Sequence, residues 1–243
     1  MILAAMQPYF FPYLGQFDLL AQADLWLAYD QAQFIRHGWV NRNRVLHPST
    51  GWQYISVPLK KHPYTIPICE VEISPLYDWR EDLFKRLGHY RKEAPYYRQV
   101  IAFLEELLAP PEENLSRLNV ALFRAVAKLL EISTPIVVFS QMGLGITPEH
   151  GPENLAMQLC HAIGADEFIN PPGGAALYDP ARLASNGIRL RIQSFSNMTY
   201  PCGRYPFEPA LSILDVLMWN TVEQVRQYLD LSRAKQTGSL GHD

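Results

Sequence analysis

Residues 1–30, MILAAMQPYFFPYLGQFDLLAQADLWLAYD, decide the fold. Ile2–Met6 is a short apolar run that predicts a buried strand, and Leu14–Gln22 carries apolar residues near helical spacing. A second apolar run follows at 25–29 and ends at Asp30. Strand, helix and strand within about thirty residues predict a βαβ unit, which implies a parallel sheet.

The rest of the chain continues this alternation around a helical middle segment. Strands are predicted at 54–59, 68–73, 135–139, 168–169 and 188–193, with a hairpin joining the first two through the turn at 60–63. Helices are predicted at 79–90, 94–108, 114–130, 152–163, 180–184 and 211–219. We therefore expect an α/β fold with a mostly parallel sheet, a nucleotide-binding-like first βαβ unit and a helical insertion at about 79–130. Residues 1–232 would form a single domain, and 233–243 a polar C-terminal tail.

Composition excludes several classes of protein. The chain has 243 residues, of which 48% are hydrophobic and 19% charged, as in an ordinary globular protein. A net charge of −3 gives no indication of a nucleic-acid partner. The N-terminus lacks a basic leader, and no window approaches the roughly 20 apolar residues of a membrane span, so we expect a cytoplasmic protein without membrane insertion. Three separated cysteines fit a reducing compartment, seven scattered histidines predict no metal site, and the oligomeric state is left open.

The first candidate site is the loop that follows the first strand. In open parallel sheets, ligands bind beyond the carboxyl ends of the strands, where helix N-termini present amides. Gln7, Tyr9, Tyr13 and Gly15 would lie there. The turn is similar to that of nucleotidylyltransferases, but Tyr13 and Gln16 stand where their His-x-Gly-His motif has histidines. A tight proline-rich turn that packs aromatic rings onto the sheet is the structural alternative.

The second candidate site is the polar and aromatic segment 29–44. Asp30 ends the second predicted strand, where a carboxylate can accept a proton or bind a sugar hydroxyl. Arginine suits phosphate recognition, and an indole can stack on a sugar or a base. A solvated basic loop is the alternative. The candidate residues are Asp30 and His37 as proton acceptors, with Gln33, Arg36, Trp39, Asn41, Arg42, Asn43 and Arg44 as binding residues.

Weaker signals lie further along the chain. The turn 170–174 contains Gly173 and Gly174, whose amides can approach a phosphate, although Walker and Rossmann spacings are absent. Asp215 lies among apolar helical neighbours and needs a polar partner if it is buried. Two interpretations are open: a structural ion pair with an arginine, or a role in ligand binding. Cys202 has no assignable histidine partner, so it is a poor candidate for a nucleophile.

Several of these segments together resemble the WbqC-like family of bacterial proteins. The segments are QPYFFPYLGQFDLLAQAD, YDQAQFIRHGWVNRNRV, INPPGG and PFEPALSILDVLMWN, and the resemblance covers nearly the whole chain. It implies an association with O-antigen and other surface-polysaccharide synthesis, and transfer of an acyl or aminoacyl group to an amino sugar. Departures are Gln31 in place of a second acid, Asn170-Pro171 in place of Ser-Gly, and Cys202 in place of Gln. The family pattern marks Gln7, Pro8, Gly15, Asp30, Gln33, Trp39, Asn41, Arg42, Asn43, Gly173, Asp215 and Asn220.

Three functions follow as hypotheses. The first is a transferase acting on a nucleotide-linked amino sugar, in which Arg36, Arg42 and Arg44 hold the diphosphate and Trp39 or Tyr9 stacks. Its small acyl or aminoacyl donor would be an adenylate, with ATP as a candidate cofactor. The second is a non-catalytic sugar-nucleotide-binding or scaffold protein of the same pathway. The third is a degenerate nucleotidyltransferase-like enzyme.

Overall fold

The computed structural model describes residues 1–146 and 151–238 and contains a parallel sheet at its centre. Among the described residues this sheet has five strands in the order β5-β2-β1-β6-β7. They are β1 (Ile2–Met6), β2 (Leu25–Ala28), β5 (Ile136–Val138), β6 (Glu167–Asn170) and β7 (Arg189–Ile192). All four neighbouring pairs are parallel, with β1 between β2 and β6. The α/β fold and the mostly parallel sheet are thereby confirmed.

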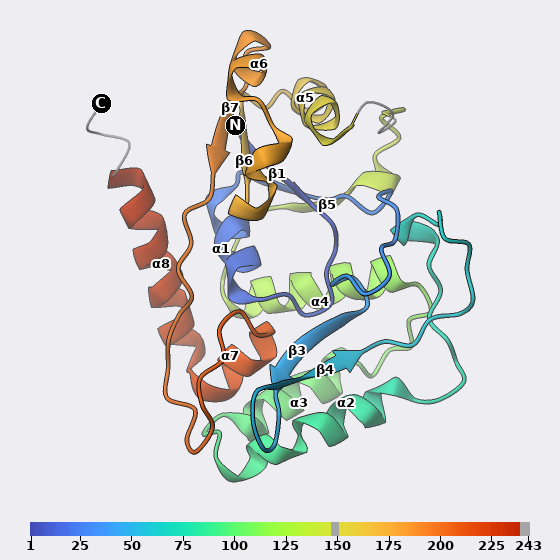
Figure 1. Ribbon diagram of the computed structural model, residues 1–243, viewed down its shortest axis with the longest axis vertical. Coiled ribbons are helices and arrows are strands. Elements are labelled where there is room, and N and C mark those ends of the chain that lie inside the picture. Colours follow the sequence, from blue (N-terminus) through green and yellow to red (C-terminus); the bar gives the residue numbers. More distant parts are fainter. Residues whose placement is uncertain (147–150, 239–243) are drawn as a thin grey trace.

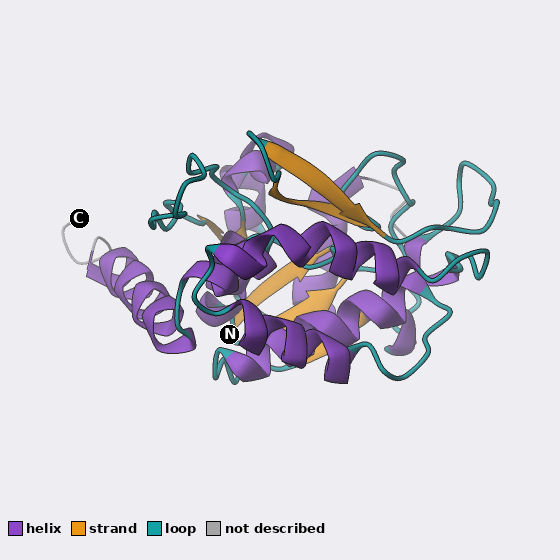
Figure 2. Cartoon of the chain, turned by 90° about the horizontal axis from the view of Figure 1, so that it is seen from below, coloured by secondary structure: helices purple, strands orange, loops and turns teal. Residues whose placement is uncertain are grey.

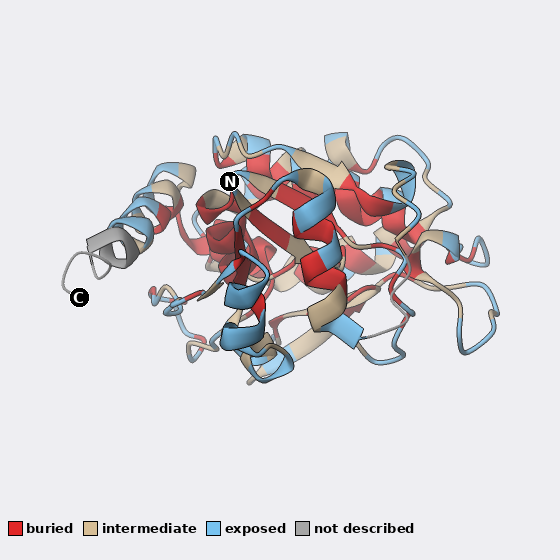
Figure 3. Ribbon diagram, turned by 90° about the horizontal axis from the view of Figure 1, so that it is seen from above, coloured by how far each residue is buried: buried red, intermediate tan, exposed pale blue. Residues whose placement is uncertain are grey.

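Helices cover both faces of this sheet (Figures 1 and 2). Side chains alternate along a strand, so Ala4 of β1 belongs to one core and Leu3 to another. The core around Ala4 is shared with α1 (Leu14–Gln22) and α4 (Leu115–Leu129). The core around Leu3 is shared with α5 (Gly151–Ile163) and α6 (Pro180–Ser185). Figure 3 shows the buried residues concentrated on the strands and on the helix faces next to them.

The order of the strands creates a switch point between β1 and β6. From β1 the chain passes through α1 to β2 on one side, and from β6 it passes through α6 to β7 on the other side. Because the two connections leave in opposite directions, the loops after β1 and β6 diverge. Crevices that bind ligands in open α/β sheets lie at such points.

A second layer contains the antiparallel hairpin of β3 (Arg42–Leu46) and β4 (Trp52–Ser56). The strand β4 contacts α2 (Trp79–Leu87), and α3 (Tyr97–Leu107) contacts α7 (Ile213–Trp219). Short 3-10 helices complete the fold: η1 (Ile68–Glu70), η2 (Gly88–Lys92), η3 (Phe139–Gln141) and η4 (Pro172–Leu177). Within the described part of the chain, no helix combines the length and the apolar character needed to cross a membrane.

The hairpin predicted from 54–59 and 68–73 is wrong. The chain reverses earlier, at Gly51, which has a φ of +67° that glycine adopts without strain. β3 therefore pairs with β4, while Ile68–Glu70 forms η1, and only an isolated bridge between Leu59 and Ile73 joins the two segments predicted to pair.

The helical middle segment contains α2, α3 and α4, and Asn114 caps α4 by accepting a hydrogen bond from the Arg117 amide, as its sequence position predicted. One helix was not predicted. The segment from Val222 to Gly238 forms α8, which includes the first part of the expected tail, whereas 239–243 lie outside the described residues. Val225 and Leu229 of α8 are buried four residues apart, a spacing visible in the sequence.

The loop after β1 is held by side-chain amides. Pro8 and Pro12 have no N–H, so the loop offers more acceptors than donors. The fully buried Asn119 of α4 donates to the carbonyls of Pro8 (2.8 Å) and Val40 (2.7 Å). The buried Asn43 of β3 donates to the carbonyls of Phe10 (3.0 Å) and Phe11 (2.8 Å). We call Asn43 and Asn119 the amide clamp, since they join the 8–11 loop to the segment 40–43.

Removing one member of the clamp should weaken the whole fold. Asn119→Ala leaves two buried carbonyls without these donors, so we expect the free energy of unfolding to fall by about 3 kcal/mol. The matched control is Gln227→Ala on α8, an exposed amide that donates to Glu223 (2.8 Å) and should change stability by about 0.5 kcal/mol or less. Urea unfolding followed by circular dichroism measures both. Equal, small effects would show that the clamp does not hold the loop.

Candidate functional site

A cavity of about 740 Å³ opens at the carboxyl ends of β1, β2 and β6, at the switch point of the sheet. Its volume is in the range of small-molecule sites. The sequence-predicted residues that line it are Gln7, Tyr9, Tyr13, Trp39, Asn43, Arg44, Gly173 and Gly174. Other lining residues are Ala5, Met6, Pro12, Gln16, Tyr29, Pro152, Leu155, Ala156, Leu159, Phe168, Asn170, Pro171, Pro172, Leu177, Tyr178, Phe195, Asn197 and Ala210.

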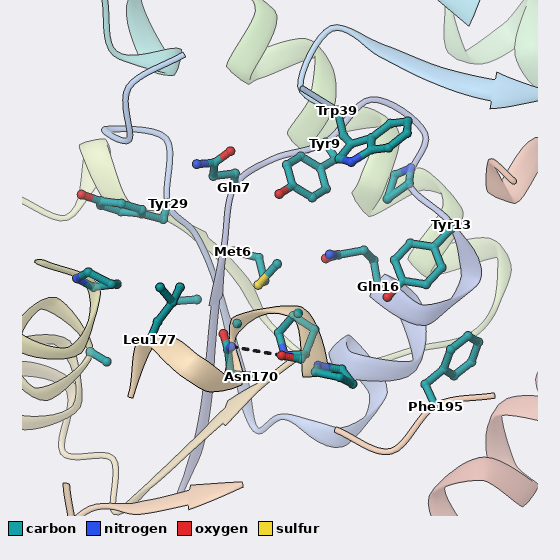
Figure 4. Close-up of a pocket in the computed structure, with 18 of the residues that line it drawn as sticks. Met6, Gln7, Tyr9, Tyr13, Gln16, Tyr29, Trp39, Asn170, Leu177 and Phe195 are labelled. Carbon is teal, nitrogen blue, oxygen red and sulfur yellow. Dashed lines mark hydrogen bonds between the residues drawn. The ribbon is translucent and has the colours of Figure 1, made fainter. Parts of the chain in front are cut away.

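Three of the side-chain amides that line the cavity are those of Gln7, Gln16 and Asn170. Gln7 follows β1, Asn170 ends the neighbouring β6, and Gln16 lies in the first turns of α1 (Figure 4). Gln16 is only 4% exposed, and its amide extends into the cavity without a hydrogen-bond partner among the described residues. Asn170 donates to the carbonyl of Pro171 (3.2 Å), which leaves its amide oxygen able to accept. These amides face the open space of the cavity, where their free donors and acceptors can form hydrogen bonds to a polar ligand.

Arg44 supplies positive charge at one side of the cavity. The centre of its guanidinium lies 5.2 Å from the ring centroid of Trp39 and 5.0 Å from that of Trp52. One terminal nitrogen donates to the Ala210 carbonyl (3.4 Å), while the buried Nε has no partner among the described residues. Of the lining residues that the structure describes, Arg44 is the only charged one. A guanidinium held by indoles and lacking a carboxylate partner is suited to bind an anionic group.

Tyrosine hydroxyls supply neutral hydrogen-bonding groups. Desolvation by burial raises the pKa of Tyr9, Tyr13 and Tyr29 above the ordinary tyrosine value, and it raises the pKa of Tyr178 to about 12. All four hydroxyls therefore stay protonated near neutral pH. They can donate to and accept from a ligand, but they carry no charge to act as a base.

Two glycines make room for cavity side chains. A Cβ at Gly15 would collide with the Tyr13 ring, and one at Gly174 would collide with the Asn170 amide. Gly15 thus contributes to the site through Tyr13, which folds back over the start of α1. Gly173 has no described atom within 4 Å of such a Cβ, so no steric reason for glycine exists there.

The structure does not bring Asp30 to the cavity. Asp30 is buried at the end of β2, where it accepts hydrogen bonds from Ser140 N (3.0 Å), Ser140 Oγ (2.7 Å) and Ser116 Oγ (3.1 Å). It lines a separate cavity of about 320 Å³. Its carboxylate is engaged by donors from η3 and α4, which ties these elements to the sheet.

Residues 33–38 of the loop before β3 also lie outside the cavity, whereas Trp39 of the same loop lines it. Arg36, His37 and Gln33 are exposed, and Gln33 donates to the Tyr64 carbonyl (3.0 Å). Arg42 donates to the carbonyls of His37 and Gly38 and lies over the Tyr54 ring at 4.1 Å.

Asn41 does not line the cavity either; it donates to the Val57 carbonyl (3.0 Å). Of the three arginines expected to hold a diphosphate, Arg44 alone lines the cavity.

Asp215 lies in the core instead of the cavity. Its carboxylate accepts hydrogen bonds from the hydroxyls of Tyr90 and Tyr200, the latter at 2.7 Å. Asp215 is therefore hydrogen-bonded by two neutral tyrosine hydroxyls, and not by the arginine that one interpretation of the sequence expected. Desolvation by burial raises the pKa of Asp215 to about 6. Asp215 thus joins α7 to η2 and to the segment around Tyr200.

Sequence reasoning missed several lining residues. Asn170 ends β6 as Gln7 follows β1, so its position beyond a strand was a usable signal. The same holds for Tyr29 after β2. Leu177 ends η4 and Phe195 comes from an irregular segment, and the approach of both to the cavity depends on long-range packing. Among residues 1–146 and 151–238, no three histidine, cysteine or acidic side chains gather as metal ligands would.

Comparison with known proteins identifies the family. The sequence profile of the WbqC-like protein family matches residues 7–227, from the start of the cavity loop into α8. The chain belongs to this family. A relative from Mycobacterium tuberculosis, named uncharacterized protein Rv1507c, is 30% identical over 233 residues, which are 95% of this chain and 98% of the relative. No solved structure matches the chain. The WbqC-like match includes the elements that form the cavity.

The buried Asp215 predicts a specific dependence of stability on pH. Its folded pKa of about 6 lies above the ordinary aspartate value of 3.8, so folding favours the protonated form. Its stabilising contribution is therefore complete below pH 4 and is lost as the pH rises to about 6, a loss of about 3 kcal/mol. Asp215→Asn cannot ionise and should not show this loss.

Urea unfolding of the two proteins from pH 4 to pH 7 measures the difference. We expect the wild-type free energy of unfolding to decline relative to that of Asp215→Asn up to about pH 6 and then to run parallel to it. Curves that stay parallel across the whole range would contradict the raised pKa of Asp215.

Proposed function

We propose that this WbqC-like protein transfers an acyl or aminoacyl group to the amine of a nucleotide-linked amino sugar. The observation that carries the proposal is the cavity itself, which combines a single described cation with neutral amides, hydroxyls and aromatic rings. Sugars are bound by such neutral hydrogen-bonding groups and by stacking, and phosphates by arginine. The assignment to bacterial surface-polysaccharide synthesis rests on the family resemblance, and a cytoplasmic location is proposed with it.

In this proposal, each end of the acceptor meets a different set of side chains. Arg44 binds a phosphate oxygen of the nucleotide, and Trp39 or Tyr9 stacks on a ring. Gln7, Gln16 and the free oxygen of Asn170 bind the sugar hydroxyls and hold the amine. Because the Gln16 amide faces the cavity without a partner among the described residues, its donors and acceptor are free to bind the polar sugar.

The chemical step is an acyl transfer to nitrogen. The amine attacks the carbonyl carbon of an activated donor such as an acyl adenylate, which would be formed from ATP. The new carbon–nitrogen bond forms, the bond from the carbonyl carbon to the phosphate oxygen breaks, and the nucleotide leaves with that electron pair. The nitrogen loses one proton to solvent. Asp30 and His37, proposed from sequence as its acceptors, do not line the cavity, and the described lining residues include no carboxylate or imidazole.

That lack of an acid or base among the described lining residues favours one alternative. The protein would then hold a nucleotide sugar without acting on it, as a binding or scaffold protein of the same pathway. Loss of free amine, followed in the presence of ATP and a small carboxylic acid, distinguishes the two functions. The degenerate nucleotidyltransferase gains less support, because Tyr13 and Gln16 occupy the positions of the two histidines. Its signature would be release of pyrophosphate.

Arg44 and Arg42 provide a matched pair for testing the binding site. Both lie on β3 and both contact aromatic rings, but only Arg44 lines the cavity. Arg44→Gln should weaken binding of nucleotide-linked amino sugars by roughly 10- to 100-fold, since a charge-assisted hydrogen bond is lost. Arg42→Gln should change the affinity less than about threefold.

Isothermal titration with a panel of nucleotide-linked amino sugars measures both effects. Circular dichroism should give both variants the wild-type spectrum. An Arg42 variant that loses affinity as strongly as the Arg44 variant would count against this cavity as the site.

A further inference from the structure

The end of the cavity next to α5 is apolar. Hydrocarbon side chains come from α5, from β6 and from η4, and several also belong to the core on that face of the sheet. Tyr178 adds a ring that contacts Phe168, with ring centroids 5.5 Å apart. The residues of this end, which we call the α5 end, are Pro152, Leu155, Ala156, Leu159, Phe168, Leu177 and Tyr178.

The opposite end of the cavity carries the polar and charged side chains. It is lined by Gln16, Asn43 and Arg44, which come from α1 and β3. Figure 4 shows Leu177 across the cavity from Tyr13 and Phe195, with Met6, Gln7 and Asn170 between them. The cavity is therefore amphipathic: the cation and polar amides lie among aromatic rings at one end, and the α5 end is mostly hydrocarbon. A single ligand that fills the cavity, or two ligands bound side by side, would need a polar part at the Arg44 end and an apolar part at the α5 end.

Leu177 gives the α5 end an exposed apolar rim. It is 54% exposed although it lines a cavity whose other leucines, Leu155 and Leu159, are buried. An exposed leucine alone is ordinary. An exposed leucine at the rim of a hydrocarbon-lined cavity offers apolar surface that an apolar ligand would bury. The binding free energy gained in this way grows with the buried area.

We infer that the α5 end binds the hydrocarbon chain of an aliphatic acyl donor, so that the transferred group is an apolar acyl group and not an aminoacyl group. This inference rests on the proposed function and narrows its substrate class. A glycyl or other aminoacyl group carries an ammonium ion, and burying that ion requires a carboxylate partner. The described residues of the α5 end include no acid, and the Tyr178 hydroxyl is neutral.

The arrangement also orders the two substrates. With the hydrocarbon chain at the α5 end and the phosphate at Arg44, the acyl carbonyl and the sugar amine meet near Gln7 and Asn170. These residues follow and end neighbouring strands, and both line the cavity. The carbon–nitrogen bond would form there, and the activating group would depart from the carbonyl carbon with its bonding electrons while the amine proton passes to solvent.

The test uses simple carboxylates as probes: acetate, butyrate, hexanoate, octanoate and glycine, titrated into the full-length protein by calorimetry. Affinity should rise by roughly fourfold for each added methylene. Glycine should bind no better than acetate. Leu177→Asp should abolish the gain with chain length, while Leu231→Asp on α8, a leucine that is 62% exposed outside the cavity, should keep it.

The outcomes separate this inference from the function on which it rests. Alkanoate binding that ignores chain length, glycine binding tighter than that of butyrate, or equal loss in the two aspartate variants would each overturn the apolar α5 end. Nucleotide sugars would still bind through Arg44 in those cases. If chain-length dependence appears but no nucleotide-linked amino sugar binds, the apolar end stands and the transferase proposal fails.

Discussion

The site depends on the hydrogen bonds by which Asn43 and Asn119 hold the loop after β1. Proline at positions 8 and 12 removes two backbone donors from that loop, and the carbonyls of residues 8, 10 and 11 accept hydrogen bonds from side chains, while Phe10 N donates to the Trp39 carbonyl (3.1 Å). The two buried amides supply four such bonds and attach the loop to the segment 40–43. Trp39 and Arg44, which flank this segment, are thereby brought to the same cavity as the loop. Without this attachment, the two halves of the site would belong to separate layers of the fold.

Topology explains why the cavity is there and why it is divided. β1 and β6 are neighbours whose connections leave in opposite directions, so the loops beyond them diverge and leave space. One wall comes from α1 and β3, which carry amides and a guanidinium. The other wall comes from α5 and η4, which extend the apolar core on that face of the sheet. An amphipathic cavity therefore follows from which layer supplies each wall.

Local patterns in the sequence predicted the parallel sheet and 8 of the 26 described residues that line the cavity. Apolar runs gave β1 and α1 with their observed bounds, and position beyond a strand gave Gln7 and Tyr9. The β3–β4 pairing was missed because residues 42–44 appeared as a charged loop. Arg42 and Arg44 point to the same face of β3, so the strand pattern does not distinguish them; the packing of Arg44 between Trp39 and Trp52 does. Asp30 is likewise held by Ser116 and Ser140, which lie 86 and 110 residues further along the chain. No local sequence pattern reveals these contacts.

The most direct test of the account is whether the buried amide of Gln16 meets a ligand. Its side-chain NH₂ resonances can be followed by nuclear magnetic resonance in ¹⁵N-labelled protein while a nucleotide-linked amino sugar is added. We predict that the Gln16 and Gln7 signals shift with a common saturation curve, while those of the exposed Gln227 stay in place. Saturable binding that leaves the Gln16 and Gln7 signals unmoved would locate the ligand elsewhere and contradict the account.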